Sequence, residues 1–131
     1  MSRNHWPIGG GIRSAIEQLI PEGATILELG SGDGTKQLAQ KYTIWSIEHD
    51  EKWVGYCDLA NYIHAPIISL LDGNIQWYDP SILEVSIPAS YDLILIDGPP
   101  GKYGREGILE NFHLFRTDVP IIIDDTIRNH E

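Results

Sequence analysis

The stretch ILELGSGDGT, residues 26–35, limits the fold of this chain more than any other feature. An apolar run that suits a buried strand ends in three glycines at every second position, Gly30, Gly32 and Gly34. Because glycine has no Cβ atom, such a turn can adopt strained dihedral angles and let a ligand lie against the backbone, near the amino end of the next helix. The stretch predicts a strand, a ligand-binding turn and a helix in succession.

Strand-like and helical patterns alternate along the rest of the chain. Helical patterns lie at 11–20, 35–42, about 53–60 and 105–115, and apolar runs of strand length lie at about 25–29, 44–48, 62–68, 92–97 and 120–124. Several of these runs are apolar on consecutive residues, which is typical of strands buried on both faces. The alternation predicts one α/β domain over residues 1–131, with a parallel sheet covered by helices on both faces.

The composition restricts the partners. Lys plus Arg is 9 against 19 Asp plus Glu, so the formal net charge is −10, which disfavours nucleic acid and anionic membranes as partners. No apolar run approaches the roughly 20 residues of a membrane span, and the amino terminus has no signal-peptide pattern. With a single cysteine, Cys57, we expect a cytoplasmic protein. The tryptophans are expected in the core or in a pocket wall.

Glycine, proline and acidic residues cluster where the predicted strands end. In open α/β sheets ligands bind beyond the carboxyl ends of the strands. The glycines follow the first predicted strand, and the motif IEHD at 47–50 lies at the end of the second. The motif IDGPPG at 96–101 lies at the end of the fourth strand, and IDD at 123–125 lies at the end of the fifth. Glu48 ends the second strand, where a carboxylate can accept two hydrogen bonds from a ribose. The G-x-G-x-G spacing differs from the G-x-G-x-x-G of NAD-dependent oxidoreductases, so a nucleoside-bearing ligand other than NAD is favoured.

Three motifs together resemble the class I S-adenosylmethionine (SAM)-dependent methyltransferases: ELGSGDG at 28–34, Glu48, and YDLILIDGPPG at 91–101. The resemblance covers about residues 12–131 and implies an open three-layer α/β/α Rossmann-like sheet of about five parallel strands in the order 3-2-1-4-5. It also implies that the glycine loop holds the amino-acid part of SAM, that Glu48 binds the ribose, and that residues after the third strand border the adenine. The cofactor-binding residues implied in this way are Glu28, Gly30, Ser31, Gly32, Asp33, Gly34, Glu48, His49, His64, Ala65 and Asp97.

Three carboxylates, Asp97, Asp124 and Asp125, are expected at the ends of neighbouring strands. They would repel one another unless a cation, a proton or hydrogen bonds compensate, and Mg²⁺ prefers such oxygen ligands. The pattern is similar to the catechol and caffeoyl-coenzyme A type O-methyltransferases, which implies that these residues hold Mg²⁺ and that the acceptor presents two vicinal oxygens. Alternatively, Asp124 and Asp125 cap a turn or helix and Asp97 contacts the cofactor.

The resemblance also implies catalytic residues after the fourth strand. Members of that family use a lysine base there, and Lys102 is the nearest candidate, so Asp97 and Lys102 are the expected catalytic pair. Tyr103 or Arg105 can instead hold an anionic acceptor. The DGPP motif is also distantly similar to the Asn-Pro-Pro-Tyr motif of N-methyltransferases, which leaves nitrogen open as the acceptor atom.

The fifth predicted strand raises the question of self-association. Only TIRNHE follows Asp125, so the last two strands of the family's sheet have no counterpart in this sequence. The PIIID strand is then expected to form a sheet edge, which a homo-oligomer would cover. The sequence therefore predicts a methyltransferase that acts on a small-molecule acceptor, with oxygen as the acceptor atom. The alternative is a non-catalytic nucleoside-binding or interaction module derived from a methyltransferase.

Overall fold

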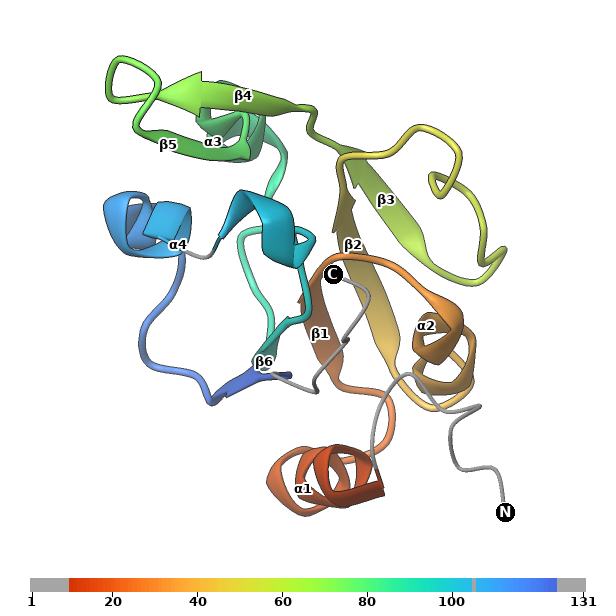
Figure 1. Cartoon of the computed structure of the whole chain (residues 1–131). Coiled ribbons are helices and arrows are strands. Elements are labelled where there is room, and N and C mark those ends of the chain that lie inside the picture. The colour runs from red at the N-terminus through yellow and green to blue at the C-terminus, as the bar shows by residue number, and fades with distance from the viewer. Residues whose placement is uncertain (1–9, 105, 125–131) are drawn as a thin grey trace.

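A five-stranded parallel sheet lies at the centre of the computed structural model, which describes residues 10–104 and 106–124 (Figure 1). The strands of this sheet lie in the order β3–β2–β1–β6–β7, and every neighbouring pair is parallel. Their bounds are Thr25–Leu29 for β1, Thr43–Glu48 for β2, Asn61–His64 for β3, Leu93–Ile96 for β6 and Ile121–Ile123 for β7. When only these strands are counted, the order is 3-2-1-4-5, as predicted.

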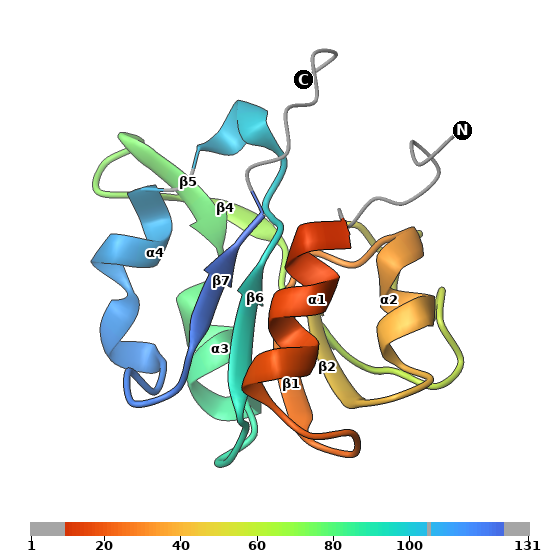
Figure 2. The ribbon, with the colours of Figure 1, turned by 90° about the horizontal axis from the view of Figure 1, so that it is seen from below.

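Two helices cover one face of the sheet. They are α1 (Gly10–Leu19) and α2 (Asp33–Leu38), and both lie on the same side of the strands in Figure 2. Ile16 of α1 and Leu38 of α2 pack against Ile26, Ile44 and Leu95 of the sheet in one hydrophobic cluster. Apolar residues at helical spacing in the sequence therefore mark the face of α1 that is buried.

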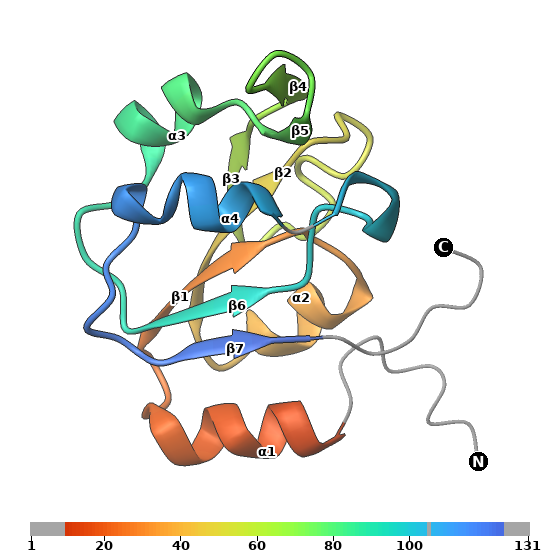
Figure 3. The ribbon, with the colours of Figure 1, turned by 60° about the vertical axis from the view of Figure 1, so that its left-hand side comes forward.

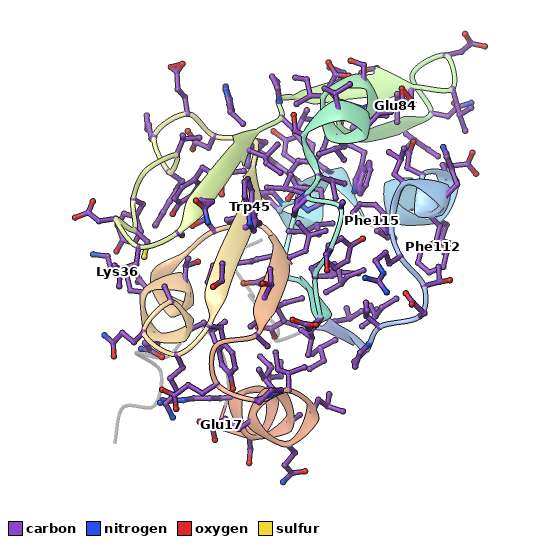
Figure 4. All side chains as sticks on the ribbon, turned by 180° about the vertical axis from the view of Figure 1, so that it is seen from behind. Glu17, Lys36, Trp45, Glu84, Phe112 and Phe115 are labelled. Carbon is purple, nitrogen blue, oxygen red and sulfur yellow. The ribbon has the colours of Figure 1, made fainter. Side chains whose placement is uncertain are left out.

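A β-hairpin and short helices cover the opposite face of the sheet. A two-stranded antiparallel hairpin, β4 (Ile67–Leu70) and β5 (Ile75–Tyr78), lies beside α3 (Pro80–Ser86), α4 (Glu106–Glu110) and the short 3₁₀ helix η3 (Phe112–Leu114) (Figure 3). Trp77, Leu83 and Phe115 from this layer pack in a second cluster. Phe115 is 6% exposed and points inward, whereas Phe112 is 37% exposed on the outer side (Figure 4). The predicted three layers are present, with a hairpin in one of them.

The central strands explain the consecutive apolar residues. All four residues of β6 are buried, and the alternation of side chains sends Leu93 and Leu95 to the cluster under α1 and α2. Ile94 and Ile96 point to the other cluster. A strand whose sheet is covered on both faces needs apolar side chains on both, so the run LILI indicates that β6 lies inside the sheet.

The prediction for the third strand is wrong at its carboxyl end. The run at 62–68 divides, because β3 ends at His64 and the chain starts β4 at Ile67 in a different sheet. Pro66 lies between the two strands and has no N–H with which to continue the ladder. The turn of the hairpin places Leu71 and Asp72 at positive φ angles of 50° and 57°.

The helix predicted at about 53–60 is also wrong. This segment consists of turns, in which the Trp53 N–H donates to Asp50 O and the Tyr56 N–H donates to Trp53 O. Gly55 has a φ of +83°, in the left-handed region, where a right-handed helix cannot continue. Within the described ranges, no helix combines the length and the apolar character needed to cross a bilayer.

Candidate functional site

A pocket of about 720 Å³ opens at the carboxyl ends of β1, β2 and β6. Its lining comes from the glycine loop, from the end of β2 with the turns that follow, from β5 and from the segment after β6. These residues are Gly30, Ser31, Gly32, Asp33, Glu48, His49, Asp50, Trp53, Tyr78, Asp97, Gly98, Pro100 and Lys102. The structure thus brings together most of the residues that the sequence places at strand ends.

The glycine loop is shaped by a close approach of two backbone segments. Gly30 has a φ of +94°, and a Cβ there would lie 3.0 Å from both the N and the Cα of Gly98. Gly32 has open space around the position of its missing Cβ. Gly34 is buried in the first turn of α2 and does not line the pocket. The first glycine is therefore structural, and the second leaves room on the pocket side of the loop.

Glu48 connects the glycine loop to the turn after β2. The Ser31 N–H donates to Glu48 Oε1 at 2.9 Å, and the Asp50 N–H donates to Oε2 at 2.8 Å. His49 Nδ1 lies 3.2 Å from the same Oε2. The carboxylate is only 3% exposed, yet it lines the pocket. These bonds hold it at the pocket wall, where it can accept hydrogen bonds from ligand hydroxyls.

Glu28 lies beneath the loop, outside the pocket lining. The Thr35 hydroxyl lies 2.9 and 3.0 Å from the two Glu28 oxygens and accepts from the Gly32 N–H at 3.0 Å. Burial raises the pKa of the Glu28 carboxyl to about 8, although the Thr35 hydrogen bond acts in the opposite direction. A neutral Glu28 is therefore the main form at pH 7. Its contact with the loop goes through Thr35, so the structure gives it a supporting position.

The segment after β6 reaches across the pocket. It contains Asp97, Gly98, Pro100 and the 3₁₀ helix η2 (Gly101–Tyr103). The Tyr103 ring packs edge-on against His49, with centroids 5.7 Å apart, so η2 approaches the end of β2. Asp97 and Lys102, the predicted catalytic pair, both line the pocket.

Two aromatic residues complete the pocket. Trp53 lies in the turns after β2, and its ring packs edge-on against Tyr56, which donates to Asp33 Oδ1 at 2.5 Å. Tyr78 comes from the hairpin, is fully buried, and places its hydroxyl 2.5 Å from the point where Gly98 would have a Cβ. Sequence reasoning missed Tyr78, because the hairpin that positions it was not predicted.

The residues expected to border the adenine do not line the pocket. His64 is exposed at the end of β3, with Nε2 3.3 Å from His49 O, and the buried Ala65 donates its N–H to Glu48 O at 3.0 Å. Both therefore contact the backbone beside Glu48 and lie outside the cavity lining. Trp53, in the turns after β2, does line the cavity.

The predicted metal ligands are only partly described. Asp97 lines the pocket. Asp124 does not line it, because this residue is 1% exposed, and its N–H donates to Ile96 O at 2.9 Å. Asp125 lies outside the described residues. Within residues 10–104 and 106–124, no three His, Cys, Asp or Glu side chains are grouped as metal ligands. The three-carboxylate Mg²⁺ site therefore stays a prediction.

The comparisons with known proteins identify the fold. No model of a protein family matches the sequence, and no curated protein does so either. Among solved structures, a TehB-like SAM-dependent methyltransferase from Corynebacterium glutamicum ATCC 13032 is similar, with a TM-score of 0.56 and 22% sequence identity. The match covers 86% of this chain and 60% of that protein, so this chain spans less than two thirds of its length. The chain therefore has a Rossmann-like α/β fold similar to that of this neighbour, which confirms the expected fold class.

Proposed function

We propose that this protein is a SAM-dependent methyltransferase that transfers a methyl group to an oxygen atom of a small molecule. One observation supports this most directly: the glycine loop, Glu48 and the Asp97–Lys102 segment converge on one pocket. The protein shares the fold that contains this pocket with a SAM-dependent methyltransferase. The pocket is large enough for a nucleoside-sized cofactor, since ligand sites commonly occupy about 300–1,000 Å³.

Glu48 is the proposed ribose-binding residue. Each of its oxygens accepts one backbone N–H, and His49 Nδ1 lies 3.2 Å from Oε2. A carboxylate offers about four lone-pair sites, so Oε1 keeps capacity for a ribose hydroxyl. Trp53 lies five residues further along the chain and offers an apolar ring to the adenine. The predicted role of His64 and Ala65 is not retained in this proposal, since neither lines the pocket.

The charges in the pocket suit a cationic methyl donor. Asp33, Glu48, Asp50 and Asp97 all line it, and the sulfonium and ammonium groups of SAM are both positive. In the proposed reaction the acceptor oxygen attacks the methyl carbon, and the C–O bond forms as the C–S bond breaks. The hydroxyl proton passes to Asp97, and S-adenosylhomocysteine leaves. Most of the rate enhancement then comes from holding the two reactants in line.

A turnover assay tests the proposal. Labelled SAM is incubated with panels of phenols, vicinal diols and amines, and the Asp97→Asn variant is compared with Asp58→Asn, which changes an exposed acid outside the pocket lining. We expect methylated oxygen products and a loss of about 100-fold or more in Asp97→Asn alone. Methylation of amines alone would contradict the oxygen assignment. Binding without turnover on any acceptor would favour a non-catalytic nucleoside-binding module.

Mg²⁺ is not part of this proposed reaction. The same assay tests the three-carboxylate site, because chelation by EDTA would stop turnover if Asp97, Asp124 and Asp125 held a required ion. Restoration by added Mg²⁺ would support that site, and full activity in EDTA would contradict it.

The cytoplasm is the proposed location. Cys57 is the one cysteine of the chain, and it is buried and unbonded. Proteins of reducing compartments have this pattern, whereas exported small domains are often disulfide-bonded. Fractionation of cells that produce the protein would test this assignment.

A further inference from the structure

The pocket has an uneven charge distribution that bears on how the cofactor's amino-acid end is held. Four carboxylates line it, and Lys102 is the single lysine or arginine among the described lining residues. A zwitterionic group has a carboxylate as well as an ammonium. The ammonium has several acidic partners available, but the carboxylate would be repelled over most of the pocket surface.

Three backbone N–H groups of the glycine loop are already hydrogen-bonded within the protein. The Gly30 N–H donates to Ile47 O at 2.8 Å, the Ser31 N–H to Glu48, and the Gly32 N–H to Thr35 Oγ1. A ligand carboxylate that took these donors would remove the backbone N–H from Glu48 Oε1 and from Thr35 Oγ1, and the loss of a donor at a buried acceptor is costly. These three N–H groups are therefore poor donors for a ligand carboxylate.

Lys102 is well placed to supply the missing positive charge. It lies in η2, and its neighbour Tyr103 packs against His49, so the backbone at this position is held close to the pocket. The Lys102 ammonium is on the Tyr103 side of the segment, 5.1 Å from that ring's centroid. Its side chain is exposed and has a long, flexible stem, so it can reach a ligand group.

We infer that Lys102 binds the α-carboxylate of the cofactor's amino-acid end, and this inference rests on the proposed function. An ammonium group that is bonded to a carboxylate keeps its proton, so Lys102 is a cofactor-binding residue and not the base that the resemblance implies. Proton removal from the acceptor is then left to Asp97.

Two ligands that differ in the amino-acid end test the inference. S-adenosylhomocysteine has the amino-acid chain, whereas 5′-methylthioadenosine keeps the nucleoside and the sulfur but lacks that chain. Calorimetric affinities are measured for both with the intact protein, with Lys102→Met and with Lys52→Met. Lys52 is exposed beside Trp53 but does not line the pocket, so it controls for the loss of one positive charge nearby.

We expect Lys102→Met to lower the affinity for S-adenosylhomocysteine about tenfold, a loss of about 1.4 kcal/mol in binding free energy. Its affinity for 5′-methylthioadenosine should change by less than about twofold. Lys52→Met should leave both affinities within about twofold. Unchanged affinity for S-adenosylhomocysteine in Lys102→Met, or an equal loss for both ligands, would overturn the inference while the proposed function stands. Failure of both ligands to bind the intact protein would overturn the proposed function and the inference with it.

Discussion

Gly30 and Gly98 meet backbone to backbone beneath the pocket, so closely that a Cβ on Gly30 would lie 3.0 Å from the Gly98 Cα. Gly30 directly follows β1, and Gly98 lies in the segment after β6, the neighbour of β1 in the sheet. The contact brings the glycine loop against the segment that holds Asp97 and Lys102. The shape of the pocket floor therefore depends on two residues that have no side chain.

Substitution of Gly98 should destabilise the fold. A Cβ at this position would lie 2.5 Å from the Tyr78 hydroxyl and 3.2 Å from Leu29 O, so Gly98→Ala should lower the free energy of unfolding by about 1–3 kcal/mol. Gly11→Ala is the control, because Gly11 lies in α1 with open space around it and alanine favours helices by up to about 1 kcal/mol. Urea unfolding measures both, and a Gly98→Ala variant as stable as the intact protein would contradict the packing described.

Replacement of Glu28 should change how stability depends on pH. Burial raises the pKa of Glu28 from 4.5 to about 8, so between these values the unfolded chain releases the proton while the folded protein keeps it. The free energy of unfolding then falls as the pH rises, by up to about 1.4 kcal/mol per pH unit, and below the unfolded pKa this effect is absent.

Glu28→Gln cannot ionise, so its stability relative to the intact protein should increase from about pH 5 to about pH 8. Urea unfolding of both proteins across that range measures the difference, and the other titrating groups cancel in the comparison. Parallel pH profiles would show that Glu28 does not keep its proton in the folded protein.

Trp53 should contribute to nucleoside binding. It lines the pocket near Glu48, and stacking of a base on an aromatic ring is worth about 1–3 kcal/mol. Trp53→Ala should therefore lower the affinities for 5′-methylthioadenosine and S-adenosylhomocysteine by the same factor, whereas Lys102→Met should lower only the second. Tyr56→Ala tests whether the neighbouring ring is needed to hold Trp53 in place. Unchanged affinity in Trp53→Ala would remove this residue from the binding site.

Self-association through β7 remains a prediction from the sequence. Among the described residues β7 pairs with β6 alone, and its Ile123 side chain is 53% exposed. An apolar strand at a sheet edge can pair with another chain, so we expect a homo-oligomer whose assembly is weakened by Ile123→Lys. Leu59→Lys is the control, because Leu59 is 66% exposed in the turns after β2. Sedimentation at micromolar concentration that finds only monomers of the intact protein would contradict the prediction.

Local sequence patterns were sufficient to predict the sheet and much of the site. Runs such as LILI identify strands buried on both faces, and the fold rule that ligands bind at strand carboxyl ends brings Gly30, Glu48, Asp97 and Lys102 to one edge. These residues are separated in the chain, but Gly30 and Asp97 directly follow strands and Glu48 ends one, whereas Lys102 lies further along, in η2. Their convergence follows from strand order, which the motifs made predictable.

The parts that failed depend on contacts between distant segments. Periodicity does not distinguish a strand of the main sheet from a strand of a hairpin, so the change of sheet at Pro66 was missed. The position of Tyr78 was missed for the same reason. His64 and Ala65, which the resemblance places beside the adenine, lie outside the pocket lining, and their role stays a prediction. The turns that replace the helix at 53–60 depend on the left-handed conformation of Gly55, which the sequence permits but does not require.

The most direct test of the central claim is a calorimetric titration of S-adenosylhomocysteine into the intact protein, into Glu48→Gln, and into Glu51→Gln as a charge-matched control that changes an exposed acid. We predict micromolar binding to the intact protein and to the control, and an affinity at least about tenfold lower for Glu48→Gln, a loss of about 1.4 kcal/mol. No binding to the intact protein, or equal affinity in Glu48→Gln, would contradict the assignment of this pocket as the SAM site.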